Sequence, residues 1–289
     1  MDADARIEAE LHAAIDRAGA KGCPPRFSES LAYAVFPGGA RVRPQLLMAV
    51  AAACGDPHPG LTDAAGAALE LLHCASLVHD DLPAFDDADH RRGKPTVHAV
   101  FGEPLAILAG DALIVLAFET IARAGMATPD RMPALTALVA RAVGAPNGIA
   151  AGQAWESEPS IPLQHYHRSK TGALFVAAAM GGAIVAGEDP RRWRKLGEKI
   201  GEAYQVADDL LDAAGRTDDG GKGLGKDAAL GRPNCVAELG VDGAVARLKG
   251  LVEDAVASIP EVYGSDRLRE LVQSQAHRLV PKNLVVAAE

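Results

Sequence analysis

The chain has 289 residues, 48% of them hydrophobic and 23% charged, and its formal net charge is −9 at pH 7. This apolar content excludes a disordered chain, and the acidic balance argues against nucleic-acid binding, which requires a basic surface over the phosphates. Aromatic residues make up only 4%, which argues against an all-β fold, because strands favour aromatic and β-branched residues. An anionic substrate would need a divalent cation to offset the negative charge of such a protein.

Apolar residues recur with helical spacing along almost the whole chain, between short breaks rich in Pro, Gly and Asp. The spacing predicts helices at residues 4–19, 27–35, 42–55, 62–81, 105–124, 130–143, 147–156, 170–187, 190–214, 233–239, 242–258 and 265–279. No convincing alternation of apolar and polar residues predicts a strand. The glycine-rich segment Gly215–Pro233 is expected to be a functional or mobile loop. We therefore expect one all-α domain over residues 1–289, a bundle of about ten to twelve helices.

The chain shows no sign of export or of membrane insertion. Residues 1–19 are acidic and amphipathic, and they lack the basic start and apolar run of a signal peptide. None of the four cysteines is in CxxC spacing, which predicts reduced thiols rather than a zinc site or disulfides. The uncharged stretch Thr171–Gly187 is short and rich in Ala and Gly, which predicts a buried helix rather than a membrane span. We expect a cytoplasmic protein that is not integral to a membrane.

The first acidic cluster lies in residues 79–95, HDDLPAFDDADHRRGKP, at the end of a predicted apolar helix. Pro83 disfavours helical geometry at the residue before it, so Asp80 and Asp81 fall in the last helical turn. Carboxylates are unfavourable there, because the helix dipole is negative at its C-terminus. Asp86 and two further aspartates follow, so the negative charges of these carboxylates repel one another unless a cation binds among them.

The second acidic cluster lies in residues 204–215, YQVADDLLDAAG. Asp208 and Asp212 are four residues apart and share one face of a predicted helix, Asp209 lies beside them, and Gln205 lies one turn earlier. The intervening residues are apolar, so the acidic face belongs to a helix that is otherwise suited to burial. Hard oxygen ligands without a Cys or His array favour Mg²⁺ over zinc. One such cluster alone would often be a solvated surface patch, but two on apolar helices make that interpretation much weaker.

Basic residues occur next to the predicted helix ends, where they are suited to phosphate contacts. They are Arg41 and Arg43, Arg91 and Arg92, Lys170, which is followed by Thr171, and Lys226 and Arg232. Each alone is typical of a solvated charge. Acidic and basic elements that alternate at helix ends indicate a site for magnesium and a diphosphate.

The order and form of these motifs resemble those of the trans-isoprenyl diphosphate synthases, which join isopentenyl diphosphate to an allylic diphosphate. Asp80 to Asp86 match the longer form of the first aspartate-rich motif, followed by Arg91-Arg92-Gly93. Asp208 to Asp212 match the second motif, and Lys170-Thr171 stands between the two. The similarity runs from about Pro37 to Pro233 and is closest to short-chain bacterial geranylgeranyl and farnesyl diphosphate synthases, which feed pathways such as carotenoid biosynthesis. It implies a helical bundle around a central apolar cavity, and a homodimer.

The resemblance also implies a role for each motif. Asp80, Asp86 and Asp208 would hold about three Mg²⁺ on the allylic diphosphate, with Asp81, Asp209 and Asp212 in support and Mn²⁺ as an alternative. The allylic diphosphate would be contacted by Arg91, Lys170, Thr171, Gln205 and Lys226. Isopentenyl diphosphate would be bound by Arg43, His73 and Arg92. The catalytic set would be Asp80, Asp81, Asp86, Arg91, Lys170, Asp208 and Asp209.

Two positions depart from the family pattern. Ala40 stands where the family usually has a lysine that contacts isopentenyl diphosphate, and Arg41 is a candidate to replace it. In the later loop, Arg232-Pro233 stands where Lys-Ser/Thr is usual, so the charge is kept and the hydroxyl is lost. We expect reduced or altered affinity rather than an inactive protein.

Ala75 and Ser76, just before the first motif, are the positions that the resemblance connects with product length. Both are small, which favours the C20 product, geranylgeranyl diphosphate, over the C15 product.

Four alternatives stand beside this interpretation. A farnesyl diphosphate synthase, or a silent subunit of a heteromeric synthase, would keep the family and change the activity. An HD-type metal phosphohydrolase would use His79 and Asp80, but it leaves the second acidic cluster unexplained. A P-loop at residues 220–227 is disfavoured, because Asp227 replaces the required hydroxyl residue and the segment follows a helix.

Overall fold

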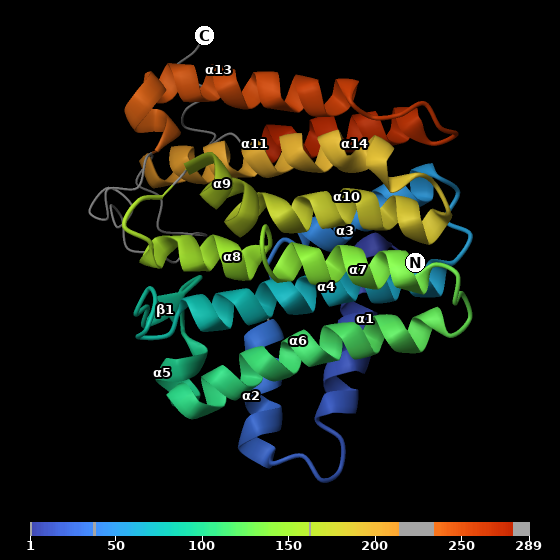
Figure 1. The fold of residues 1–289 in the computed structure, drawn as a ribbon. Coiled ribbons are helices and arrows are strands. Elements are labelled where there is room, and N and C mark those ends of the chain that lie inside the picture. The colour runs from blue at the N-terminus through green and yellow to red at the C-terminus, as the bar shows by residue number, and fades with distance from the viewer. Residues whose placement is uncertain (1, 37–38, 162, 214–233, 280–289) are drawn as a thin grey trace. The chain divides into compact units, whose positions relative to one another are not determined.

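The computed structural model describes residues 2–36, 39–161, 163–213 and 234–279, and nearly all of them lie in helices (Figure 1). The expected all-α class is confirmed. The chain divides into two compact units, one formed by Met1–His90, Lys94–Ala140 and Ala178–Pro190, the other by Arg91–Gly93, Arg141–Ala177 and Arg191–Glu289. The single domain expected from the sequence stays a prediction.

The first unit is formed by the N-terminal helices. They are α1 (Ala3–Ala18), α2 (Pro25–Val35), α3 (Val42–Ala53), α4 (Pro59–Asp80), α5 (Val97–Phe101), α6 (Glu103–Gly125), most of α7 (Met132–Val143) and the larger part of α10 (Ala173–Ala186). Proline stands in the first turn of α2, α4 and α6, where its fixed φ and missing N–H cost nothing.

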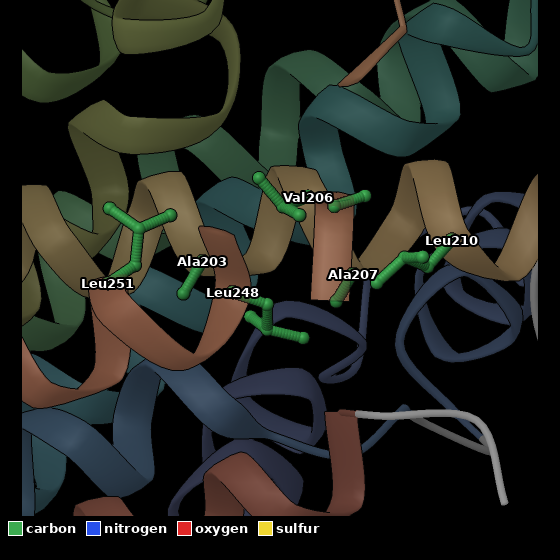
Figure 2. Close-up of a cluster of buried hydrophobic side chains, with 7 residues drawn as sticks. Ala203, Val206, Ala207, Leu210, Leu248 and Leu251 are labelled. Atoms are coloured by element: carbon green, nitrogen blue, oxygen red, sulfur yellow. The ribbon is translucent and has the colours of Figure 1, made fainter. Parts of the chain in front are cut away.

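The second unit is formed by shorter helical pieces and then by long C-terminal helices. They are α8 (Ile149–Ala154), η1 (Trp155–Ser157), α9 (Leu163–His167), the π-helical turn η2 (Arg168–Gly172), η3 (Pro190–Trp193), α11 (Arg194–Ala213), α13 (Cys235–Ala257) and α14 (Ser265–Leu279). Its core lies between α11 and α13, where Val206 and Leu210 meet Leu248 and Leu251 (Figure 2).

The helix pattern from the sequence is close to the observed one, with four differences. α5 was not predicted. The stretch from residue 163 to 186 is three joined pieces rather than one helix from residue 170. The two helices expected on either side of residue 240 are joined in α13 across a kink at Gly240, whose φ of 70° is non-helical. The pairs β1 (His90–Arg91) and β2 (Lys94–Pro95) form a two-stranded ribbon, too short for an alternating pattern to appear in the sequence.

Helix α4 is the central element of the first unit and runs beside α6 (Figure 1). Leu69, Leu71 and Leu72 are fully buried on it. Near its C-terminal end, His79 approaches α6 so closely that a Cβ at Gly110 would lie 2.0 Å from its Nε2 atom. The same nitrogen lies 3.2 Å from the carbonyl oxygen of Ile107. The close approach therefore holds the end of α4 against α6, at the point where the first acidic cluster begins.

Three helical stretches in the described residues are long and apolar enough to cross a membrane, by length and composition alone: Pro59–Asp80, Glu103–Gly125 and His165–Ala186. Inside the protein, 78%, 44% and 61% of their most apolar windows are buried, in that order. The uncharged stretch Thr171–Gly187 belongs largely to the third, which is mostly buried. Helix α6 differs, because it exposes several large apolar side chains.

Candidate active site

The first aspartate motif is a closed turn at the C-terminal end of α4. Asp80 is the last helical residue and Asp81 is the C-cap, and their exposed fractions are 7% and 4%. The N–H of Asp86 donates to the carbonyl oxygen of Asp80 at 2.9 Å, and the N–H of Ala88 donates to that of Asp81 at 3.1 Å. The backbone therefore folds residue 86 back onto residue 80. Two buried carboxylates at the negative end of a helix dipole are suited to a cation.

The turn is followed by the ribbon that carries the two arginines of the motif. Arg92 and Gly93 connect β1 to β2 with φ values of 52° and 73°, as a two-residue turn of type I′ requires. Arg91 is half-buried and Arg92 is exposed at the turn.

Arg43 and His73 lie on neighbouring helices of the first unit, Arg43 in the first turn of α3 and His73 on α4. Both are half-buried. Ala75 is 1% exposed, and Ser76 is half-buried and donates its hydroxyl to the carbonyl oxygen of His73 at 2.8 Å. The two small residues connected with product length therefore lie on the same helix as the first motif, one to two turns before it.

Arg41 is turned into the first unit, onto two carboxylates. Its guanidinium contacts Glu8 and Glu70 at 2.7 and 2.9 Å, and its side chain is 4% exposed. This geometry speaks against the interpretation that Arg41 replaces the lysine missing at Ala40. The sequence does contain an indication of this pair. Glu70 is the lone charge in the buried stretch Gly66–Leu72, and a buried charge needs a partner.

In the second unit, Lys170 lies in the π-helical turn η2 and is held by a carboxylate that sequence reasoning missed. Its Nζ donates to Glu156 Oε1 at 2.6 Å. The hydroxyl of Tyr166 donates to the same oxygen at 2.5 Å, and Gln153 Nε2 donates to Oε2 at 2.9 Å. Single π turns inside α-helices are frequent at functional sites. Nothing in the spacing of Glu156 and Lys170 predicts the pair, because the two residues lie in different elements, η1 and η2, rather than on one regular helix.

A chain of hydrogen bonds joins Lys170-Thr171 to the second aspartate motif on α11. Thr171 Oγ1 donates to Gln205 Oε1 at 3.0 Å, and Gln205 Nε2 lies 3.2 Å from Asp209 Oδ1. The other oxygen of Asp209 accepts the N–H of Cys235, in the first turn of α13, at 2.7 Å. Asp209 is 6% exposed, so this carboxylate fastens α13 to α11.

Asp208 and Asp212 lie on the exposed face of α11, as their four-residue spacing predicts. The three carboxylates of this motif therefore differ: Asp209 is buried in the unit, and the other two are exposed.

Two expected site residues, Lys226 and Arg232, lie outside the described residues, together with the loop that carries them. Within the described ranges, no group of three or more His, Cys, Asp or Glu side chains forms a ready-made metal site. Mg²⁺ is commonly held by one or two carboxylates together with phosphate oxygens of a substrate, rather than by a complete protein cage. The carboxylates of the two motifs fit that mode of binding.

Comparison with known proteins adds a family and close relatives. The sequence profile described as Polyprenyl synthetase matches residues 24–261. A geranylgeranyl diphosphate synthase from Cereibacter sphaeroides is 54% identical over 281 residues, which cover 97% of this chain and 98% of that protein. A farnesyl diphosphate synthase from Escherichia coli is 40% identical over 268 residues, 88% of this chain and 89% of that protein. A geranyltransferase structure from Helicobacter pylori, complexed with magnesium and isoprenyl diphosphate, matches with a TM-score of 0.78 at 25% identity, over 95% of this chain and 97% of that chain.

Proposed function

This chain belongs to the polyprenyl synthetase family, and from this premise we propose that it joins isopentenyl diphosphate head-to-tail to allylic diphosphates, with geranylgeranyl diphosphate as the end product. It is a prenyltransferase, and the reaction releases diphosphate. The observation that carries the C20 product is the similarity to a geranylgeranyl diphosphate synthase along nearly the whole of both chains. The two aspartate motifs, each at a defined place on a helix, support the same reaction.

Magnesium is the cofactor that the donor set fits, since both motifs offer carboxylate oxygens. In the first unit Asp80 and Asp86 would bind it, supported by Asp81. In the second unit Asp208 would bind it, supported by Asp209 and Asp212. Bound there, about three Mg²⁺ would neutralise the departing diphosphate and so favour ionisation of the allylic C–O bond.

The basic residues would bind and orient the two diphosphates. Lys170, already fixed by Glu156, would donate to an oxygen of the allylic diphosphate and stabilise the negative charge that grows there as the bond breaks. Thr171 and Gln205, hydrogen-bonded to each other, would keep that region of η2 in place. Arg43 and His73 would hold isopentenyl diphosphate with its double bond toward the allylic carbon, so that proximity replaces a bimolecular encounter.

Product length would be limited by the side chains of α4 just before the first motif. Ala75 and Ser76 are small, so a growing chain meets little bulk there. This feature supports the C20 product over the C15 product that farnesyl diphosphate synthases release.

We also propose a cytoplasmic homodimer. On the outward face of α6, Ile107, Leu108 and Val115 are 45%, 52% and 68% exposed. An apolar face of this kind is typical of an interface, and a second copy would cover it. The charge-introducing change Val115→Asp should give a monomer by light scattering, and a dimer that persists would remove this face as the interface.

Product analysis tests the function directly. The protein is incubated with Mg²⁺, isopentenyl diphosphate and, separately, the C5, C10 and C15 allylic diphosphates, and the dephosphorylated alcohols are separated by length. We expect a C20 product from each primer and none from Asp80→Asn. A C15 end product would keep the reaction and refute the argument from Ala75 and Ser76. Absence of condensation with every primer would refute the proposal and favour a silent subunit of a heteromeric synthase. Release of inorganic phosphate would instead indicate a phosphohydrolase.

A further inference from the structure

Arg41 has an unusual backbone conformation that turns its side chain into the first unit. It is the N-cap residue of α3 with φ 48° and ψ 34°, in the left-handed region that residues with a Cβ rarely adopt. A conformation of this kind persists only where the surrounding contacts enforce it. Here those contacts are made by the guanidinium.

The guanidinium connects three segments of the unit. Its Nη1 atom donates to Glu70 on α4 at 2.9 Å, its Nε atom to Glu8 on α1 at 2.7 Å, and its Nη2 atom to the carbonyl oxygen of Val35 at 3.1 Å. Burial acts to lower the pKa of Arg41, but the hydrogen bond to Glu8 and the charge of Glu70 outweigh it, so that the pKa is raised. Arg41 and Glu70 therefore form a buried ion pair.

This pair lies beside both groups that would hold isopentenyl diphosphate. Arg43 follows Arg41 by two residues in the first turn of α3, and His73 follows Glu70 by three residues on the same face of α4. A shift of α3 against α4 would therefore change the distance between Arg43 and His73. We propose that the Arg41–Glu70 pair is a positioning device that holds Arg43 and His73 at the spacing that isopentenyl diphosphate requires. This inference rests on the function proposed above.

Two arguments favour positioning over a purely stabilising role. A buried ion pair is a weak stabiliser, because desolvation offsets most of its attraction, and apolar residues of similar volume often replace it without loss. The position where the family usually has a lysine for isopentenyl diphosphate holds Ala40 in this chain. With that charge absent, the spacing of the remaining ligands has a larger effect on binding.

The test compares the two substrates in variants of the pair. Glu70→Gln and Arg41→Lys keep the size of each side chain. The double variant Arg41→Met/Glu70→Leu removes both charges of the buried pair, and Glu8, which loses its partner, has a side chain that is 40% exposed and can be solvated. The matched control is Asp63→Asn, which breaks an ion pair between α1 and α4 in the same unit, that of Asp63 with Arg6 at 2.6 Å. For each protein, KM is measured for isopentenyl diphosphate and for the allylic diphosphate, the Kd of isopentenyl diphosphate by calorimetry, and Tm by scanning calorimetry.

We expect each variant of the pair to raise the KM and the Kd of isopentenyl diphosphate by about tenfold, with the allylic KM within about twofold of wild type. The double variant should recover Tm without recovering the KM, and its effect should not exceed that of the single variants, because all three break the same unit. The control should leave both KM values unchanged.

Three results would overturn the positioning role. The first is a Glu70→Gln variant with unchanged KM and Kd for isopentenyl diphosphate. The second is an equal rise of the KM values of both substrates. The third is a double variant that recovers both Tm and the KM of isopentenyl diphosphate. Wild-type protein that binds isopentenyl diphosphate without condensing it would refute the proposed function alone, since the Kd still reports on Arg43 and His73.

Discussion

At Gly152, a single added methyl group should displace Lys170, the residue proposed to bind the allylic diphosphate. A Cβ at Gly152 would lie 2.4 Å from the backbone nitrogen of Lys170 and 2.6 Å from its Cα. Ordinary contact begins at 3.4 Å, so the main chain of η2 must move by about 1 Å to admit the Gly152→Ala methyl group. The neighbour is backbone rather than the end of a flexible side chain, so a change of rotamer cannot relieve the clash.

A displacement of that size at a substrate-positioning residue costs up to about 100-fold in rate. We expect Gly152→Ala to lower kcat/KM for the allylic diphosphate by about 10- to 100-fold, with the KM of isopentenyl diphosphate nearly unchanged. The assay is steady-state condensation with the second substrate saturating.

Gly250→Ala is the matched control for this change. Gly250 lies inside α13, and apart from the neighbouring backbone of that helix no atom of the described residues lies within 4 Å of an added Cβ. Alanine there should leave both KM values unchanged and stabilise the protein by about 0.5–1 kcal/mol. If Gly152→Ala retains wild-type kcat/KM for the allylic substrate, the reasoning that η2 must hold Lys170 in place is refuted.

Three further predictions concern other parts of the site, two of them substitutions and one a reaction rate. Ala75→Phe should shorten the main product from C20 to C15 or less, seen by chromatography of the alcohols, and an unchanged product spectrum would remove the argument from α4. Asp209→Asn should lower the free energy of unfolding in urea by about 1–3 kcal/mol, because the buried carboxylate accepts the N–H of Cys235; unchanged stability would contradict the fastening role. Burial and then the charge of Asp209 raise the pKa of the Cys235 thiol, so less thiolate is present at a given pH. Cys235 should therefore react with iodoacetamide more slowly at pH 8.5 than a thiol in an unfolded peptide does, and equal rates would count against this environment.

Much of the fold follows from local rules that the sequence carries. The recurrence of apolar residues predicts α1, α3, α4 and α6 within a few residues of their observed ends, because a helix in a large protein must bury one face or all of them. Pro83 predicts the end of α4, and with it the position of Asp80 and Asp81, because the residue before a proline avoids helical geometry.

Other features depended on contacts between distant residues. The π turn at Lys170 has no local sequence signature. It packs against the backbone of Gly152, and its lysine donates to Glu156. The inward direction of Arg41 follows from Glu8 and Glu70, which are 33 and 29 residues away. The sequence of a phosphate-binding motif does not distinguish a basic residue that faces solvent or substrate from one that faces a buried carboxylate.

The sequence by itself determined the helical class, most helix ends, and the two aspartate motifs, because periodicity, proline geometry and carboxylate spacing act over a few residues. Only the tertiary structure decided which partner each charged side chain of a motif contacts. It distinguished Asp209, which holds α13, from the exposed Asp208 and Asp212, and it assigned Glu156 to Lys170 and Glu70 to Arg41. The reason is that a buried charge takes its partner from whichever segment packs against it, and that segment is set by the packing of whole helices.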